Sequence, residues 1–149
     1  MSLKTAVIGL GKKGFRGWAL DGLYSQELTH VGAILKTAGL RLSAVCELDE
    51  NRCKEFEGWL WSRGFIPNEG VDWPLISTDP MEAIPPVECF SDYQDMMNKL
   101  KPEVVSIATP VKTHAKIVRN VMRFDCVKAI LLEKPISDNI EDAKLIVED

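Results

Sequence analysis

The chain has 149 residues, of which 46% are hydrophobic and 27% are charged, and its formal net charge is -4. This length and composition are typical of one globular domain with one core. The net negative charge excludes a broad basic surface of the kind that binds nucleic acid or an anionic membrane. We find no signal-peptide pattern and no apolar run of membrane-spanning length, and we therefore expect a cytoplasmic protein.

The chain contains four scattered cysteines and two histidines, which are Cys46, Cys53, Cys89, Cys126, His30 and His114. No Cys-x-x-Cys pair occurs, so the sequence predicts no metal site. We expect the four cysteines to be buried, reduced thiols in a cytosolic protein.

The first predicted strand, Thr5–Ile8, runs directly into Gly9-Leu10-Gly11-Lys12-Lys13-Gly14. In such a loop Gly9 allows the tight turn, Gly11 lets a pyrophosphate approach the backbone, and Gly14 lets the next helix pack on the strand. The helix N-terminus adds free N–H donors and partial positive charge. Lys12 and Lys13 add further attraction for a pyrophosphate, or they are solvated surface charges. The motif predicts a dinucleotide-binding loop.

A helical pattern over 15–38, with a break near Asp21-Gly22 or Ser25, leads to the second predicted strand, Arg41–Cys46. Glu47 follows that strand at its carboxyl end. An acid in this place accepts hydrogen bonds from the adenosine ribose and repels the 2′-phosphate of NADP. The expected cofactor is therefore NAD, with NADP less favoured.

Two observations weigh against this role of Glu47. Arg52 is a nearby counter-charge, and Glu47 lies 33 residues past Gly14, whereas the usual interval is about 20. We attribute the excess to the long segment over 15–39. The alternative is a solvated carboxylate at the end of a strand.

The middle of the chain combines two predicted helices with a proline-rich stretch. One helix spans Asn51–Arg63 with Gly64 as its stop, and another begins at Ser91 or Asp92 and runs to about Leu100. Between them, the 64–86 segment contains five prolines, which prevent regular structure. We expect a lid, a binding loop, an oligomer contact or a loop packed on its own core. The third predicted strand, Val87–Phe90, follows this segment.

The fourth predicted strand, Val104–Ala108, ends in Thr109-Pro110, and a helix is predicted over Thr113–Phe124. Ligands of open α/β sheets bind beyond the carboxyl ends of the strands, so Thr109 and Pro110 are candidate cofactor-binding residues. His114 in the first helical turn is a candidate catalytic residue. The alternative for His114 is a structural cap or a surface group.

The fifth predicted strand, Ala129–Leu132, ends in Glu133-Lys134-Pro135. A lysine facing a cofactor can bind ribose hydroxyls or exchange a proton with an alcohol. The alternative is a salt-bridged pair at the end of a strand. A last helix is capped by Ser137 or Asp138, with Glu141 three residues after Asp138.

Apolar strands that alternate with amphipathic helices predict one fold class. It is an α/β domain with an open, doubly wound, mainly parallel sheet and helices on both faces.

In this order, the motifs resemble the N-terminal domain of the Gfo/Idh/MocA family, which includes glucose–fructose oxidoreductase and inositol dehydrogenase. Glu133-Lys134-Pro135, combined with Thr109-Pro110, is the most specific part of the resemblance. The resemblance covers nearly the whole chain apart from its two long segments. It implies an NAD(P)-binding Rossmann domain over 1–149. The implied reaction is hydride transfer to or from a hydroxyl-bearing carbon of a sugar, cyclitol or related small molecule.

The resemblance also implies roles for individual residues. Gly9, Gly11 and Gly14 would hold the pyrophosphate, and Glu47 the adenosine ribose. Thr109 and Pro110 would line the cofactor groove, with His114 near cofactor and substrate. Glu133 and Lys134 would lie near the nicotinamide ribose, Lys134 also being close to the reacting oxygen, and Pro135 is often cis in the family.

The family's substrate domain and its further catalytic pair have no counterpart in the sequence. We therefore expect a cofactor-binding piece of a longer, homo-oligomeric enzyme that binds NAD but turns over poorly by itself. The alternatives are a natural short protein, a non-catalytic NAD sensor or regulatory protein on the same fold, and a methyltransferase with a glycine-rich first loop.

Overall fold

The computed structural model describes residues 2–16, 19–20, 23–24, 29–62 and 87–148. The predicted stop at Gly64, the 64–86 loop and the breaks at Asp21-Gly22 and Ser25 lie outside these residues. The described elements are β1 (Leu3–Ile8), η1 (Lys12–Arg16), β2 (Ala19–Leu20), β3 (Leu23–Tyr24), α1 (His30–Lys36), β4 (Leu40–Cys46), α2 (Glu50–Ser62), β5 (Glu88–Phe90), α3 (Tyr93–Leu100), β6 (Val104–Ile107), η4 (Val111–Thr113), α4 (His114–Val121), β7 (Ala129–Leu132) and α5 (Ile140–Glu148).

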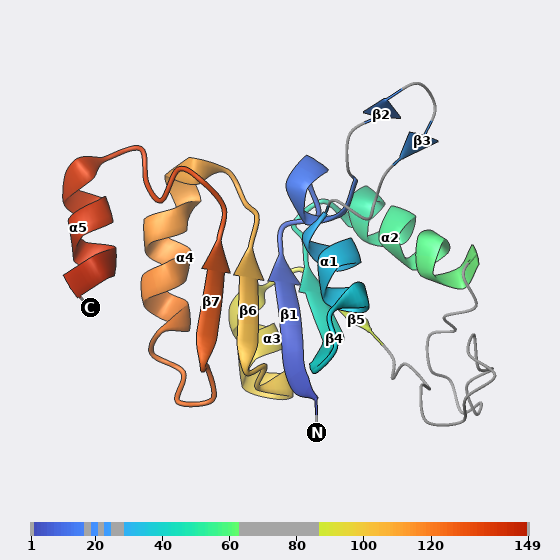
Figure 1. Ribbon diagram of the computed structural model, residues 1–149, viewed down its shortest axis with the longest axis horizontal. Coiled ribbons are helices and arrows are strands. Elements are labelled where there is room, and N and C mark those ends of the chain that lie inside the picture. The colour runs from blue at the N-terminus through green and yellow to red at the C-terminus, as the bar shows by residue number, and fades with distance from the viewer. Residues whose placement is uncertain (1, 17–18, 21–22, 25–28, 63–86, 149) are drawn as a thin grey trace.

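The main sheet has five strands in the order β5-β4-β1-β6-β7, with β1 at its centre. All its strand pairs are parallel, so the carboxyl ends of the strands meet at one edge of the sheet (Figure 1). The chain moves outward from β1 through β4 to β5, and then crosses to β6 and β7 on the other side of β1. The predicted doubly wound sheet and its five strands are confirmed.

Helices cover both faces of the sheet, and each face has its own hydrophobic core. Ala6 and Ile8 of β1 face a core shared with α3 and α4, whereas Val7 between them faces a core shared with α1 and α2. This division follows from the alternation of side chains along a strand. Because both faces are covered, most residues of the central strands β1, β4 and β6 are apolar.

The predicted helix over 15–38 is wrong at Ala19–Leu20 and Leu23–Tyr24. Ala19–Leu20 and Leu23–Tyr24 pair as two short antiparallel strands. Helix α1 begins only after Thr29, whose Oγ1 accepts a 3.1 Å hydrogen bond from the Gly32 N–H. In the sequence an Asp-Gly dipeptide separates the paired strands, and this signal favours a hairpin over a helix.

The boundaries of the later helices agree with the sequence except at two ends. Helix α4 ends at Val121 instead of Phe124. Helix α5 is capped by Asn139 and not by Ser137 or Asp138, because Asn139 Oδ1 accepts a 2.8 Å hydrogen bond from the Glu141 N–H. Asparagine, serine and aspartate cap helices about equally well, so residue type alone does not choose among three neighbours.

The expectation of four reduced thiols is wrong for Cys53 and Cys89, which form a disulfide between α2 and β5. Their Cα atoms lie 6.2 Å apart, although 36 residues separate them in the sequence. Cys46 is a buried free thiol and Cys126 a half-buried one. Burial, together with the negative charges of Asp92 and Glu47, raises the pKa of the Cys46 thiol to about 12.

Candidate functional site

The glycine loop leaves β1 at the carboxyl edge of the sheet, and its three glycines have different surroundings. Gly9 has a φ of +97°, and its N–H donates a 2.8 Å hydrogen bond to the Cys46 carbonyl. A Cβ atom on Gly14 would lie 1.8 Å from the Gly9 carbonyl oxygen, so only glycine allows this close packing. A Cβ atom on Gly11 would meet nothing within 4 Å. The predicted turn and packing roles of Gly9 and Gly14 thus have a direct steric basis, and Gly11 faces open space.

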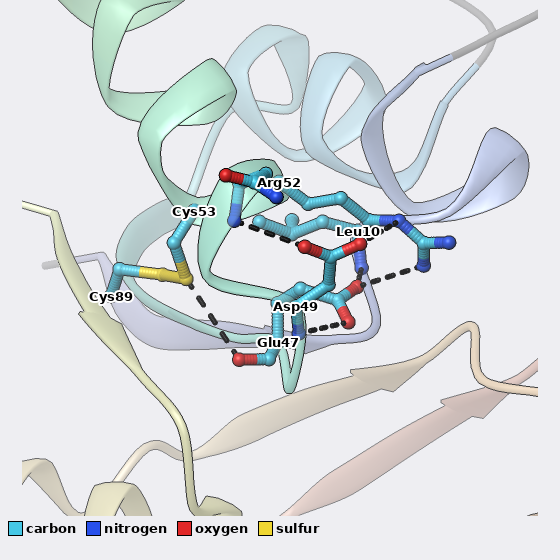
Figure 2. A network of polar contacts seen from close by, with 7 residues as sticks. Leu10, Glu47, Asp49, Arg52, Cys53 and Cys89 are labelled. Atoms are coloured by element: carbon cyan, nitrogen blue, oxygen red, sulfur yellow. Dashed lines mark hydrogen bonds and ion pairs between the residues drawn. A yellow bond between two sulfur atoms is a disulfide. The ribbon is translucent and has the colours of Figure 1, made fainter.

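Glu47 ties the glycine loop to the end of β4 (Figure 2). Its Oε2 accepts a 2.8 Å hydrogen bond from the Leu10 N–H, and its Oε1 accepts one of 3.1 Å from the Asp49 N–H. The Arg52 guanidinium lies 3.5 Å from Glu47 Oε2 and 3.4 Å from Asp49 Oδ2. Glu47 is 9% exposed. The carboxylate is therefore a partly buried anion with fixed donors on each oxygen.

The Cys53–Cys89 disulfide lies beside this network, because Cys53 follows Arg52 in the first turns of α2 (Figure 2). The Cys53 sulfur lies 3.9 Å from the Glu47 carbonyl oxygen. The disulfide and the Glu47–Arg52 ion pair together hold the start of α2 against the ends of β4 and β5.

His114 lies beneath the turn that follows β6 and is 1% exposed. Its Nε2 lies 2.9 Å from the Thr109 carbonyl oxygen, and its Nδ1 lies 2.9 Å from the Pro135 carbonyl oxygen. Each ring nitrogen therefore contacts a backbone acceptor, and the ring joins the turn after β6 to the turn after β7. The Lys134–Pro135 peptide bond is cis, as the resemblance implies.

Glu133 follows β7, and its side chain contacts His30, the first residue of α1. Its Oε1 lies 3.0 Å from His30 Nε2, and His30 Nδ1 lies 2.5 Å from Ser106 Oγ. The hydrogen bond from His30 is the main reason that the pKa of Glu133 is lowered, with the positive charge of Lys13 contributing. Lys134 is exposed next to it.

Sequence reasoning missed His30 and Ser106 as site residues. The available signals were a Thr-His pair at the start of a helix and one hydroxyl inside an otherwise apolar strand. Neither signal shows that the two side chains meet, because 76 residues separate them.

A pocket of about 470 Å³ opens at this edge of the sheet and is lined by seven of the predicted site residues, which are Gly9, Gly11, Lys12, Lys13, Glu47, Thr109 and Pro110. Arg52, Asp92, Tyr93 and Lys116 also line it. Gly14, His114, Glu133 and Lys134 do not line the pocket. Gly14 and His114 are buried, whereas Glu133 and Lys134 follow β7 at the same edge of the sheet.

The described residues form neither a metal-binding cluster nor a membrane-spanning helix. Within these ranges, no group of three or more His, Cys, Asp or Glu side chains has an arrangement that suits a metal ion. Among the helices that the structure describes, none combines the length and the apolar character needed to cross a membrane.

A parallel sheet whose strand order reverses beside β1, with a glycine loop and a pocket at that point, defines a Rossmann-type dinucleotide-binding domain. A family model described as "oxidoreductase family, NAD-binding Rossmann fold" matches residues 75–149. The chain belongs to this family, the Gfo/Idh/MocA oxidoreductases. The predicted resemblance is confirmed.

Solved structures share the fold at low sequence identity. The WlbA dehydrogenase from Bordetella pertussis, in complex with NADH and UDP-GlcNAcA, aligns with a TM-score of 0.66 and 17% identity over 99% of this chain and 34% of its own. The myo-inositol 2-dehydrogenase from Lactobacillus plantarum aligns with a TM-score of 0.58 and 16% identity over 99% of this chain and 33% of its own. A dehydrogenase from Chromobacterium violaceum aligns with a TM-score of 0.64 and 17% identity over 99% of this chain and 32% of its own. The chain thus spans about a third of the length of these proteins. No curated protein matches it.

Proposed function

We propose that the chain is the cofactor-binding part of an NAD-dependent oxidoreductase that transfers hydride to or from a hydroxyl-bearing carbon of a sugar, cyclitol or related small molecule. The observation that carries this proposal is the pocket at one edge of the sheet. It is lined by the glycine loop, by Glu47 and by Thr109-Pro110. The small-molecule class is suggested by the fold neighbours, which include a myo-inositol dehydrogenase and a dehydrogenase in complex with a UDP-sugar.

The residues present fit a dinucleotide. The open side of Gly11 leaves room for a pyrophosphate to reach the first N–H groups of η1, and Lys12 and Lys13 line the same pocket with positive charge. Thr109 and Pro110 line the same pocket. When bound, the nicotinamide group supplies the hydride acceptor or donor.

The charges around Glu47 favour NAD over NADP. Glu47 and Asp49 share the single cation of Arg52, so this group of three side chains carries a net charge of about -1 at neutral pH. The 2′-phosphate of NADP would add further negative charge beside them, whereas the ribose hydroxyls of NAD can donate to the Glu47 carboxylate.

Lys134 is our candidate for proton exchange with the substrate oxygen. It is exposed at the end of β7, directly after Glu133, which we assign to the nicotinamide ribose. A lysine ammonium there donates a proton to an alkoxide or a hydrogen bond to an alcohol. His114 remains a predicted catalytic residue, and its two carbonyl contacts give it the further task of holding the turns that carry Thr109 and Pro135.

Calorimetric titration of the chain with NADH and NADPH tests the proposal. We expect NADH to bind with micromolar-range affinity and more tightly than NADPH. Absence of binding by both nucleotides would contradict the proposal, and binding of S-adenosylmethionine instead would favour a methyltransferase.

A second experiment separates an enzyme from an NAD sensor. In the natural protein, assayed with a panel of sugars and polyols, Lys134→Ala is expected to abolish NADH production while NAD binding persists. Turnover that is unchanged by Lys134→Ala would remove Lys134 from the mechanism and favour the sensor. Lys128→Ala is the matched control, because Lys128 precedes β7 at the opposite edge of the sheet.

A further inference from the structure

A chain of polar side chains links the interior of the sheet to the end of β7. Ser106 is a serine in the central part of β6 and is 1% exposed. His30 is the first residue of α1, and its side chain is 10% exposed. Glu133 is the first residue after β7, and its side chain is 24% exposed. Three elements that are distant in sequence thus place one hydroxyl, one imidazole and one carboxylate in a row.

The backbone fixes both ends of this row. Thr29 caps α1 with its side chain, which sets the position of His30 in the first helical turn. The Glu133 N–H donates a 3.0 Å hydrogen bond to the Ile107 carbonyl, so the sheet ladder continues past β7 to this residue. The sheet ladder therefore holds the Glu133 backbone, and the contact with His30 holds its carboxylate.

The direction of each hydrogen bond follows from the donors and acceptors available. An ionised Glu133 only accepts hydrogen bonds, so His30 Nε2 carries the proton that it receives. In a neutral imidazole the other nitrogen then has no hydrogen, and Nδ1 accepts from the Ser106 hydroxyl. The Glu133 carboxylate thus selects the His30 tautomer with its proton on Nε2, and the Ser106 hydroxyl matches that tautomer by donating to Nδ1.

We propose that His30 and Ser106 are positioning residues that orient the Glu133 carboxylate toward the cofactor. The inference rests on the proposed function, in which Glu133 binds the nicotinamide ribose. Oε1 is engaged by His30, and a carboxylate has enough lone pairs to accept a further hydrogen bond from a ribose hydroxyl. Because Lys134 follows Glu133 directly, the contact between His30 and Glu133 also limits where the Lys134 backbone can lie.

Two substitutions of His30 separate the contacts. A glutamine amide reaches about as far as Nε2, so His30→Gln retains a donor for Glu133. An asparagine amide reaches only about as far as Nδ1, so His30→Asn retains the Ser106 contact and loses Glu133. We expect His30→Asn to weaken NADH binding about tenfold, the loss of one hydrogen bond to a charged group, and His30→Gln to restore most of that loss.

The decisive measurement is a double-mutant cycle on the 149-residue chain, with NADH binding followed by calorimetry. Glu133→Gln should weaken binding about as much as His30→Asn, and the double variant should be no weaker than Glu133→Gln alone. Losses that multiply in the double variant would overturn the proposal, because His30 would then act independently of Glu133. Glu103→Gln is the matched control, since Glu103 pairs with Lys128 at the opposite edge of the sheet.

An NMR measurement tests the hydrogen-bond chain without any ligand. The chain has two histidines, so the ¹⁵N signals lost in His30→Gln belong to His30. We expect the Nε2–H tautomer, a mixture of tautomers in Glu133→Gln because an amide can donate or accept, and a shifted Nδ1 signal in Ser106→Ala. An Nδ1–H tautomer or no response to either variant would overturn the orientation. If the parent chain binds no NADH while these NMR results hold, the proposed function fails and the hydrogen-bond chain stands.

Discussion

Leu10 and Glu47 are 37 residues apart in the sequence, yet the Leu10 N–H donates a 2.8 Å hydrogen bond to Glu47 Oε2. Leu10 lies inside the glycine loop, and Glu47 is the first residue after β4. One side chain thus closes the loop that would hold a pyrophosphate onto the strand end that would hold the adenosine ribose. We therefore expect the stability of the loop and the affinity for the cofactor to be coupled through Glu47.

Replacing Glu47 by alanine is expected to reduce both quantities. The substitution leaves the N–H groups of Leu10 and Asp49 without their acceptor, which costs about 1.5–3 kcal/mol of unfolding free energy for bonds to a charged group. NADH affinity should fall about tenfold or more, which corresponds to about 1.4 kcal/mol or more of binding free energy. Urea unfolding and calorimetry measure the two effects. Glu50→Ala is the control, because exposed Glu50 forms a surface ion pair with Lys54, and a Glu47 variant as stable as this control would contradict the coupling.

The glycine loop allows a contrast between two alanine substitutions. Gly14→Ala places a Cβ atom 1.8 Å from the Gly9 carbonyl oxygen, so we expect a loss above about 4 kcal/mol or failure to fold. Gly11→Ala meets no protein atom within 4 Å, so its unfolding free energy should change by less than about 0.5 kcal/mol. Its NADH affinity should nevertheless fall, because the methyl group occupies the side from which the pyrophosphate approaches.

Gly58→Ala is the reference for these two variants. Gly58 lies within α2 with nothing within 4 Å of a built Cβ, and alanine there should stabilise the helix by about 1 kcal/mol. A Gly11→Ala chain that binds NADH as tightly as Gly58→Ala would remove Gly11 from the pyrophosphate site.

Most of the fold could be predicted from the sequence because its central strands β1, β4 and β6 are largely buried on both faces. Runs such as Ala44-Val45-Cys46 are then continuously apolar, and the helices between them show a clear helical period. The hairpin over Ala19–Leu20 and Leu23–Tyr24 could not be distinguished this way. Its leucines also match a helical spacing, and only the Asp-Gly pair between the strands indicated otherwise.

The site could be predicted only where a local motif carries it. Gly9, Glu47 and Thr109 each follow a predicted strand, and a parallel sheet brings such residues to one edge. The contact between His30 and Glu133 spans 103 residues, and no pattern within either segment specifies it. The disulfide was missed for the same reason, since cysteine spacing does not determine pairing.

The disulfide should be visible both chemically and in stability. With Cys53 and Cys89 paired, the unfolded and unreduced chain should expose two thiols, those of Cys46 and Cys126. The double change Cys53→Ser with Cys89→Ser should lower the unfolding free energy by about 3–4 kcal/mol, the value for a loop of this size. Urea unfolding measures this loss.

A reductant supplies the control for this comparison. Dithiothreitol should lower the unfolding free energy of the parent chain toward that of the double serine variant. The unfolding free energy of the variant itself should not change. Cys126→Ser should behave like the parent. Four reactive thiols in the unreduced parent would show that the bond does not form.

The buried Cys46 thiol predicts a loss of stability at alkaline pH. Its pKa is raised from 9.0 to about 12 in the folded chain, mainly by burial, so the unfolded state releases this proton first as pH rises. The contribution is fully present below pH 9.0 and is lost up to about pH 12, with a slope of at most about 1.4 kcal/mol per pH unit.

Urea unfolding at several alkaline pH values tests this slope. Cys46→Ala should flatten the pH dependence in that window, although the variant is less well packed at neutral pH. Cys126→Ala should leave the slope as it is. A parent chain and a Cys46→Ala chain with parallel pH profiles would contradict the prediction.

The link between Cys53 and Cys89 changes what backbone cleavage can do to this protein. A protease that cuts the chain once between the two cysteines produces two polypeptides that remain one covalent molecule. The edge strand β5 then stays attached to α2 and beside β4 without an intact connection between them. In an oxidising solution such a nicked protein would migrate as a single species and keep its strand order, and only a reductant would release the fragments.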